Sequence, residues 1–599
     1  MNAPTFLRKP QPAGSSTRRG LLSGSYDTHT PEILHVSCGP GVERAERNGW
    51  TALSLGRPWF RSTEYTELAR REGVAIAWLA AFQRHGAQAP QYAAGDFAVV
   101  VFDASSNCVY LAVDRFSTRT LCYTHSNGAM HFADRADEVP NAPRELSSQS
   151  IFDYLHSHAI AGPQTIFAHV SRLPQGSTLV FRDGRANIEA YWQPNFHVSE
   201  KADFASLREQ FLDLVKTAVA RQTDGSDKTA CFLSGGTDSS TVSGMLGRLR
   251  GDPADTYSIG FDAAGYDEME YARIAARHFG TRHHEYYVTP EDLVAGIPHV
   301  AASFDQPFGN SSVLPSYYCC RKAHDDGFTR MLAGDGGDEL FGGNSRYALQ
   351  RLLGLYDILP APMRTGLMEP LLLKTPVIGK LPLLRKAAGY VRLARMPMPD
   401  RLHSHNLLQR LGYSDVMEPD FLASINLAGP LEHQRATWSR AGNCGLINGM
   451  LAYDWKYTLA DSDLPKVMGA SQLAGVSIGF PLLDDDLLDF SARLPIQYKL
   501  KGFKLRWFFK EALREFLPPE IIVKKKHGFG LPFGVWIGRY APLKDLALEA
   551  LQGVARRGII RPAFVADLTH KYLPEHPGYY GEMVWILMML EHWLRAHVD

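Results

Sequence analysis

Residues 231–240 read CFLSGGTDSS, an apolar approach into a turn of Ser, Gly and Asp that a predicted helix follows. Such a turn points several backbone N–H groups at one spot, and the helix dipole strengthens the field there. The carboxylate of Asp238 would repel a phosphate bound at this turn. An acidic residue at this position therefore indicates that Mg²⁺ lies between the carboxylate and the phosphate. The stretch predicts a pyrophosphate site that carries a metal, and the alternative is an ordinary Ser/Gly turn.

A second segment, residues 333–343, reads AGDGGDELFGG and follows the short apolar run 328–332. Open α/β sheets place their ligands at the carboxyl ends of parallel strands. Asp338 could therefore complete a Mg²⁺ site with Asp238, because Mg²⁺ takes one or two carboxylates plus phosphate oxygens. A solvated acidic turn is the alternative, and the paired occurrence of the two segments argues against it.

A third segment, residues 524–534, reads KKKHGFGLPFG. A charge run usually marks a solvated helix face or a nucleic-acid patch. Here the lysines run into a Gly/Phe/Pro stretch that is neither helical nor polar, which suggests that an ordered loop delivers a lysine into a site. A lysine opposite polyphosphate stabilises charge that builds up in a transition state.

These three segments, in this order, resemble the synthetase half of asparagine synthetase-type enzymes. SGGTDSS is similar to the family's SGGxDSS loop, and GDGGDELFGG is similar to its GxGxDExFGG loop. Residues 464–467 with 481–484 resemble the LPKVD…PFLD region, and residues 504–506 through 528–529 resemble KxxLR…RxKxGF. The resemblance covers about residues 200 to 540. Thr237 stands where Leu is commoner, and Asp335 stands where Glu is commoner.

The N-terminal region resembles the other half of the same enzymes in damaged form. Residues 95–103, 112–116, 121–123 and 191–192 resemble its GDFAxxxxD, RDRxG, PLYY and YW segments. That half is normally a glutaminase whose N-terminal cysteine uses its own α-amine as base. This chain starts with Met1, and RGPD, RLSI and NGE segments are absent. Cys38 precedes a glycine, but residues 33–36 before it read as a strand of the fold, so we expect a glutaminase fold without its nucleophile.

Composition sets outer limits on the class of protein. The 599 residues carry 63 basic and 63 acidic side chains, so the net charge implies no nucleic-acid or membrane partner. Seven scattered cysteines fit a reducing, cytoplasmic location better than a disulfide framework. We expect a flexible tail at 1–30, a degenerate glutaminase-like α/β sandwich at 31–195 with one helix near 62–85, and at 200–599 a doubly wound parallel-sheet ATP-pyrophosphatase domain with a helical C-terminal part.

The resemblance implies ATP and Mg²⁺ as cofactors and a two-step reaction. A carboxylate attacks the α-phosphorus of ATP to give an acyl-adenylate and pyrophosphate, and an amine then displaces AMP. It implies Lys526 and Asp335 as catalytic residues and Asp238 and Asp338 as metal ligands. Lys466 and Arg506 are candidates for phosphate contacts or for structural ion pairs. The nucleotide would contact Leu233, Ser234, Gly235, Gly236, Thr237, Asp238, Ser239, Ile259, Ala333 and Gly334.

Three functions compete at this stage. Without a glutaminase, the amine must come from elsewhere, as in the lasso-peptide macrolactam synthetases, which resemble this chain in having a degenerate N-terminal half. That resemblance implies a precursor peptide substrate, a leader-processing protease and a leader-binding partner. The second candidate is an asparagine synthetase that uses free ammonia or glutamine. The third is a non-catalytic nucleotide-binding relative, against which the intact loops weigh.

Overall fold

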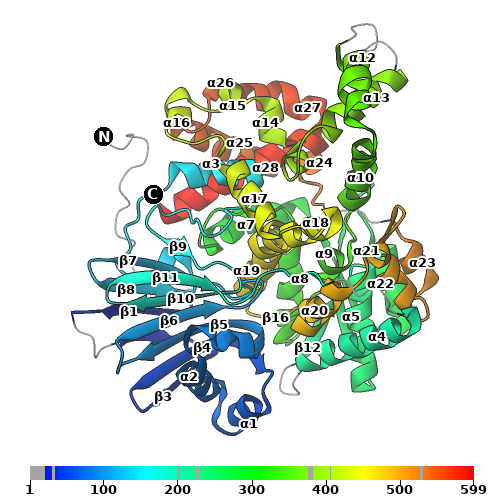
Figure 1. Ribbon diagram of the computed structural model, residues 1–599. Coiled ribbons are helices and arrows are strands. Elements are labelled where there is room, and N and C mark those ends of the chain that lie inside the picture. Colours follow the sequence, from blue (N-terminus) through cyan, green and yellow to red (C-terminus); the bar gives the residue numbers. More distant parts are fainter. Residues whose placement is uncertain are drawn as a thin grey trace.

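A computed structural model describes residues 20–29, 34–197, 203–223, 228–374, 382–404, 406–525 and 530–599. An N-terminal sandwich of two sheets lies beside a parallel sheet that is enclosed by helices (Figure 1). Further helices from the C-terminal half lie above both (Figure 1). The expected fold class is confirmed.

The N-terminal sandwich consists of antiparallel strands in two sheets. One sheet has the order β2-β1-β8-β7-β9 and the other has the order β11-β10-β6-β5-β4-β3. The strands are β1 (Leu22–Asp27), β2 (Leu34–Cys38), β3 (Val42–Arg47), β4 (Trp50–Phe60), β5 (Ala93–Asp103), β6 (Cys108–Val113), β7 (Cys122–Ser126), β8 (Ala129–Ala133), β9 (Ser171–Arg172), β10 (Ser177–Arg182) and β11 (Arg185–Ala190).

Strand β5 shows how the sequence builds these layers. Successive side chains of a strand point to opposite faces. Val100 and Phe102 join the core between the two sheets. Val99 and Val101 instead pack against helices α1 (Thr63–Glu72) and α2 (Val74–His85), among the residues around Trp78. The strand is buried on both faces, and its apolar run reflects that.

Two expectations for this region were wrong. Residues 22–27 belong to the fold rather than to a tail, because β1 lies between β2 and β8 and buries Leu22 and Tyr26. The single helix near 62–85 is two helices, since Gly73 between them has φ +102°, which a helix cannot contain. Residues 1–19 lie outside the described part of the chain.

The second sheet is parallel, with the order β14-β13-β12-β15-β16. Strand order reverses between β12 and β15, and such switch points are where open α/β sheets bind ligands. The strands are β12 (Thr229–Phe232), β13 (Asp255–Phe261), β14 (Arg282–Val288), β15 (Arg330–Leu332) and β16 (Ser477–Gly479). The helices around this sheet include α4 (Phe204–Arg221), α5 (Thr237–Arg250), α6 (Met269–Phe279), α7 (Pro290–Ser303) and α8 (Val313–Asp325).

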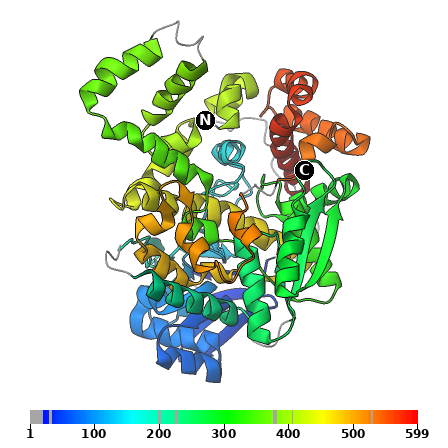
Figure 2. The same cartoon turned by 90° about the vertical axis from the view of Figure 1, so that its right-hand side faces the viewer.

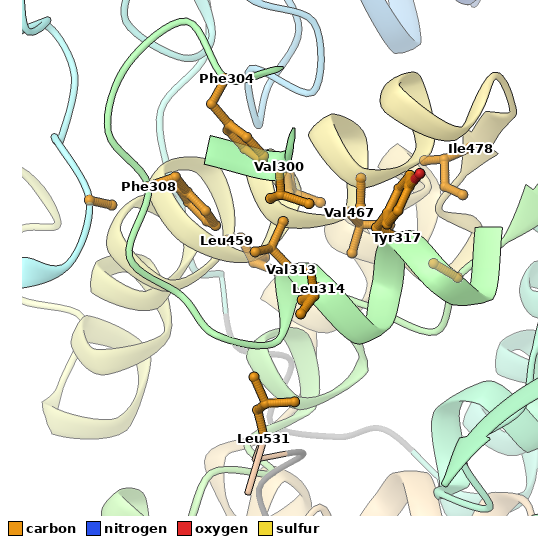
Figure 3. Packing of buried hydrophobic residues seen from close by; sticks show 14 of the residues in the cluster. Val300, Phe304, Phe308, Val313, Leu314, Tyr317, Leu459, Val467, Ile478 and Leu531 are labelled. Atoms are coloured by element: carbon orange, nitrogen blue, oxygen red, sulfur yellow. The ribbon is translucent and has the colours of Figure 1, made fainter. Parts of the chain in front are cut away.

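A continuous apolar core joins this sheet to helices from later in the chain (Figure 3). Val313 and Leu314 of α8 lie close to Leu459 and Val467, which come from the π-helix η7 (Trp455–Asp463) and from α19 (Leu464–Ala474) (Figure 3). The core therefore fixes η7 and α19 against the sheet, and through them the LPKV segment.

Ion pairs and hydrogen bonds hold the two halves together directly after the PLLD segment. Asp485, at the start of α20 (Asp485–Arg493), accepts a hydrogen bond of 2.7 Å from the Gly95 nitrogen and pairs with Arg115 at 2.7 Å. Arg61 reaches Asp486 at 3.0 Å. The sandwich thus docks on the helix that follows β16.

Two further features of the C-terminal half are a helical arm and a long buried helix. A helical arm projects from the body (Figures 1 and 2) and consists of α10 (Ser345–Gly354), η3 (Leu355–Ile358), α11 (Ala361–Met363), η4 (Arg364–Met368), α12 (Glu369–Lys374) and α13 (Pro382–Ala394). Helix α28 (Pro577–His597) buries its apolar stripe, including Trp585, as expected. Across the described ranges, the helices are too short or too polar to span a bilayer.

Candidate active site

The CFLSGGTDSS segment forms a strand, a tight loop and a helix. Strand β12 ends at Phe232, and α5 begins at Thr237 with Gly236 at its N-cap. The Ser239 hydroxyl accepts a hydrogen bond of 3.1 Å from the Ser234 nitrogen and lies 3.0 Å from the Ser234 hydroxyl. The first turn of a fourteen-residue helix therefore faces the loop, which is the arrangement that binds phosphate.

The AGDGGDELFGG segment lies against this loop. Strand β15 pairs with β12, and the chain after it passes directly over the start of α5. A Cβ atom on Gly334 would lie 2.6 Å from the Ser239 nitrogen. Only glycine permits this approach, so Gly334 sets the distance between the two loops.

Strand β13 supplies the third side of the site. The Leu233 nitrogen donates a hydrogen bond of 2.9 Å to the Tyr257 carbonyl, and the Ser258 hydroxyl bonds to the Leu233 carbonyl. Ile259 follows in the same strand and is only partly buried. Leu233 and Ala333 directly follow β12 and β15, and Ile259 lies two residues before the end of the neighbouring β13. Their contact with a nucleotide stays a prediction.

Asp238 and Asp338 converge on one cation of the protein itself. Arg506 donates from one nitrogen to Asp238 at 2.8 Å and to Asp338 at 2.6 Å, and its other terminal nitrogen also bonds to Asp238. Arg506 is 5% exposed. Burial opposes its charge, yet the two carboxylates raise the pKa of Arg506 above its ordinary value. The bidentate geometry favours a strong pair.

This convergence tests whether Mg²⁺ fits the site. One oxygen of Asp238 and one of Asp338 lie within 2.8 Å of the same Arg506 nitrogen, so both could also contact a single divalent ion. Among the described residues, three or more His, Cys, Asp or Glu side chains never gather into a metal site. Mg²⁺ held by one or two carboxylates and completed by phosphate oxygens needs no such group. The two carboxylates therefore fit Mg²⁺, provided that the Arg506 side chain moves away from them.

Asp335 lies beside a lysine rather than beside the other two aspartates. Lys466 is 3.9 Å from Asp335 and 2.9 Å from Asp463. Burial raises the pKa of Asp335 to about 6, and Lys466 acts against that rise. For Lys466, burial disfavours the charge, but Asp463 and Asp335 hold its pKa above the usual value. Of the two roles open for Lys466, the contacts match a structural ion pair.

The third segment is described only in part. Lys526 lies outside the described residues, as do 527–529. Lys524 is described and lies on the first loop. Its ammonium is 3.4 Å from the Gly235 carbonyl and 3.1 Å from Glu268. Burial lowers the pKa of Lys524, and Glu268 acts against that fall. The described part of the basic run therefore reaches the phosphate loop, and the predicted role of Lys526 stays a prediction.

Sequence reasoning missed the π-helix η7, which leads directly into Lys466. Pi-helical turns are rare and often occur at functional sites. Lys456 and Thr458 project from η7. Lys456 pairs with Asp461 at 3.1 Å, and Thr458 accepts a hydrogen bond from Arg346 at 2.9 Å. The apolar and polar residues of 455–463 have no spacing that would reveal the wider turn.

Comparisons with known proteins identify the family and the relatives of this chain. The asparagine synthase family matches residues 210–595, and the glutamine amidotransferase domain matches residues 72–192. An "Asparagine synthetase [glutamine-hydrolyzing] 1" of Bacillus subtilis is 24% identical over 87% of this chain and 80% of its own length. A "Putative asparagine synthetase [glutamine-hydrolyzing]" of Mycobacterium bovis is 22% identical over 90% and 82%. One named "Putative asparagine synthetase [glutamine-hydrolyzing] 2" in Methanocaldococcus jannaschii is 27% identical over 63% and 72%.

The family match extends over well more than half of the chain and contains both loops, Arg506 and the third segment. The matched amidotransferase region covers the part of the sandwich from α2 to β11. The chain therefore belongs to the asparagine synthase family and is an ATP-dependent amide ligase.

Proposed function

We propose that this enzyme closes an amide within one peptide, joining the N-terminal amine of a precursor to an Asp or Glu side chain that it has adenylated. A carboxylate of the peptide attacks the α-phosphorus of ATP, and pyrophosphate leaves. The peptide's own amine then attacks the acyl-adenylate, AMP leaves, and the product is lighter than its precursor by one water. Holding both ends of one molecule converts a bimolecular attack into an intramolecular one.

The observation that carries this proposal is the place of the first cysteine. Cys38 is exposed at the end of β2, an edge strand, and β1 precedes it in the same sheet. A glutaminase of this type needs its cysteine at the start of the first strand, where a free α-amine can act as base. The stretch that leads into β1, residues 18–21, reads RRGL. The position of Cys38 supports our proposal that the sandwich does not release ammonia, and that the amine comes from the substrate.

The protein's own groups have distinct tasks in this reaction. Backbone N–H groups at the start of α5 and the hydroxyls of Ser234 and Ser239 would bind the departing pyrophosphate. Mg²⁺ bound to Asp238 and Asp338 would offset its negative charge. Lys526 would stabilise charge on the transferring phosphoryl or acyl group. Asp335, held by Lys466, would accept a hydrogen bond from the attacking amine.

The comparisons favour a second candidate, an asparagine synthetase that uses free ammonia or glutamine. The relatives quoted above are all named as asparagine synthetases. Adenylation of aspartate would use the same loops and the same Mg²⁺ site, so the two candidates differ only in the carboxylate and the amine. The precursor peptide, the leader-processing protease and the leader-binding partner all belong to the first proposal.

One experiment separates the two. Purified protein is given ATP and Mg²⁺ with aspartate plus ammonium or glutamine in one arm, and with a precursor peptide encoded near its gene plus its processing partner in the other. AMP release and product mass are measured in both. A peptide lighter by one water, with no asparagine in the first arm, supports macrolactam closure. Asparagine in the first arm overturns it in favour of the second candidate.

A further inference from the structure

The helical arm exposes more apolar surface than any comparable part of the described chain. Large apolar side chains that are at least one third exposed number thirteen among the described residues, and seven of them fall in the arm. Ile358 is 75% exposed and Leu367 is 63% exposed. The seven are Leu349, Leu352, Leu355, Ile358, Met363, Leu367 and Leu371. Contiguous exposed apolar side chains on a folded protein mark an interaction site.

These side chains are not needed for the arm's own packing. Leu353, Tyr356, Val391 and Ala394 form a separate buried cluster between the helices of the arm. The exposed residues follow helical spacing in two runs, three residues apart from 349 to 358 and four apart from 363 to 371. Each run therefore places exposed apolar side chains of successive turns next to one another, at the edge of the inner cluster.

The arm is also the basic part of a chain whose net charge is zero. Residues 345–395 contain nine Lys and Arg against two Asp and Glu, and residues 370–399 contain no acidic residue. Arg364 pairs with Asp357, and Arg395 pairs with Glu369. On α13, Arg385, Lys386 and Arg392 are exposed and form no ion pair within the described ranges. The net charge of the whole chain is zero and gave no reason to expect a membrane partner, because it averages the basic arm with more acidic regions.

We infer that the arm binds an anionic lipid surface. Exposed aliphatic side chains beside unpaired Arg and Lys are what an interfacial helix uses, apolar groups entering the acyl boundary and cations meeting the headgroups. The arm projects from the body (Figures 1 and 2), so the body leaves it open to contact with a flat surface. Protein interfaces concentrate energy in Trp and Tyr as well as in Arg. Tyr356 of the arm is buried, and Tyr390 bonds to the Leu352 carbonyl at 2.9 Å.

The test is flotation of the full-length protein with vesicles. Vesicles of phosphatidylcholine are compared with vesicles that also contain about one third phosphatidylglycerol, at low and high salt. We expect the protein to float with the anionic vesicles at low salt and to stay behind with the neutral ones. The double variant Leu367→Glu/Leu371→Glu and the triple variant Arg385→Glu/Lys386→Glu/Arg392→Glu should each lower the bound fraction on the order of tenfold.

A matched control places the same charge elsewhere. Ile188 is 39% exposed on β11, and Ile188→Glu should leave flotation unchanged. All variants alter exposed side chains, so each should retain ATP–pyrophosphate exchange, which reports folding. No flotation of the wild type, or equal flotation of the arm variants, overturns the proposal. It is overturned too if the wild type is a dimer in solution that Leu367→Glu/Leu371→Glu dissociates, because these side chains would then contact a second copy.

Discussion

The sandwich and the parallel sheet carry their family's features in different ways. In the sandwich, paired strands and two apolar cores keep the fold, while the first cysteine, Cys38, lies exposed at the end of β2. In the parallel sheet, both loops between β12 and α5 and after β15 retain glycines, hydroxyls and aspartates at one edge. Folding depends on many apolar residues, whereas chemistry depends on a few polar ones, so a domain can keep one and lose the other.

The largest expected effect concerns Asp238, which this comparison treats as indispensable. Asp238→Asn keeps the shape but removes the charge that would face the metal, so ATP–pyrophosphate exchange should fall on the order of a thousandfold. Asp213→Asn is the control, because Asp213 is an exposed carboxylate on α4. If the ATP–pyrophosphate exchange rate of Asp238→Asn is within a few-fold of wild type, Asp238 does not bind the metal.

The lysine run can be resolved one position at a time. Lys526→Ala should lower product formation on the order of a hundredfold or more while ATP still binds, because it removes charge stabilisation in the transition state. Lys524→Ala should have a smaller effect on product and should weaken ATP binding, since Lys524 supports the phosphate loop through the Gly235 carbonyl. Lys525 is exposed, and Lys525→Ala should be neutral. Full activity in Lys526→Ala would make our assignment of that lysine wrong.

Arg506 tests whether the two aspartates form a metal site. Arg506→Gln leaves Asp238 and Asp338 facing each other without their cation, which should cost about 3–5 kcal/mol in free energy of unfolding. Mg²⁺ can then replace the lost charge, so it should raise the Tm of the variant more than that of the wild type. Arg321→Gln is the control, because its pair with Asp325 is exposed. Equal Mg²⁺ effects in both proteins would argue against ion binding by this pair.

Asp335 gives a pH dependence of intermediate size. Burial raises its pKa to about 6, so the ionised form needed to accept a hydrogen bond from the amine appears as pH rises through about 6. Product formation should therefore rise over that range. Lys466→Met removes a charge that favours ionisation and should move the rise upward by about one pH unit or more. Lys501→Met removes an exposed charge and should not shift it. If the pH profile of product formation is the same in Lys466→Met as in wild type, ionisation of Asp335 does not control the rate.

The loops were predictable and their long-range partners were not. The glycines and aspartates of 231–240 and 333–343 define local turns, which sequence spacing reveals. The resemblance named Arg506 as a candidate for a phosphate contact or an ion pair, but it did not name its partner, because Arg506 reaches Asp238 across 268 residues. Strand β1 looked like a tail because Ser23, Gly24 and Ser25 suggest flexibility, yet it pairs with β8 about a hundred residues later. Tertiary contacts override local preference in such cases.

The smallest expected effect is that of Cys38→Ala, which tests directly whether the sandwich still holds a catalytic cysteine. Cys38→Ala changes an exposed side chain at the end of an edge strand, so free energy of unfolding should change by less than about 0.5 kcal/mol. Synthesis with the peptide, or with ammonium, should be unchanged. Cys444→Ala serves as a second cysteine control. Loss of glutamine-dependent product in Cys38→Ala alone would mean that the sandwich has moved its nucleophile rather than lost it. The amine would then come from glutamine, and the argument for closure within one peptide would lose its main support.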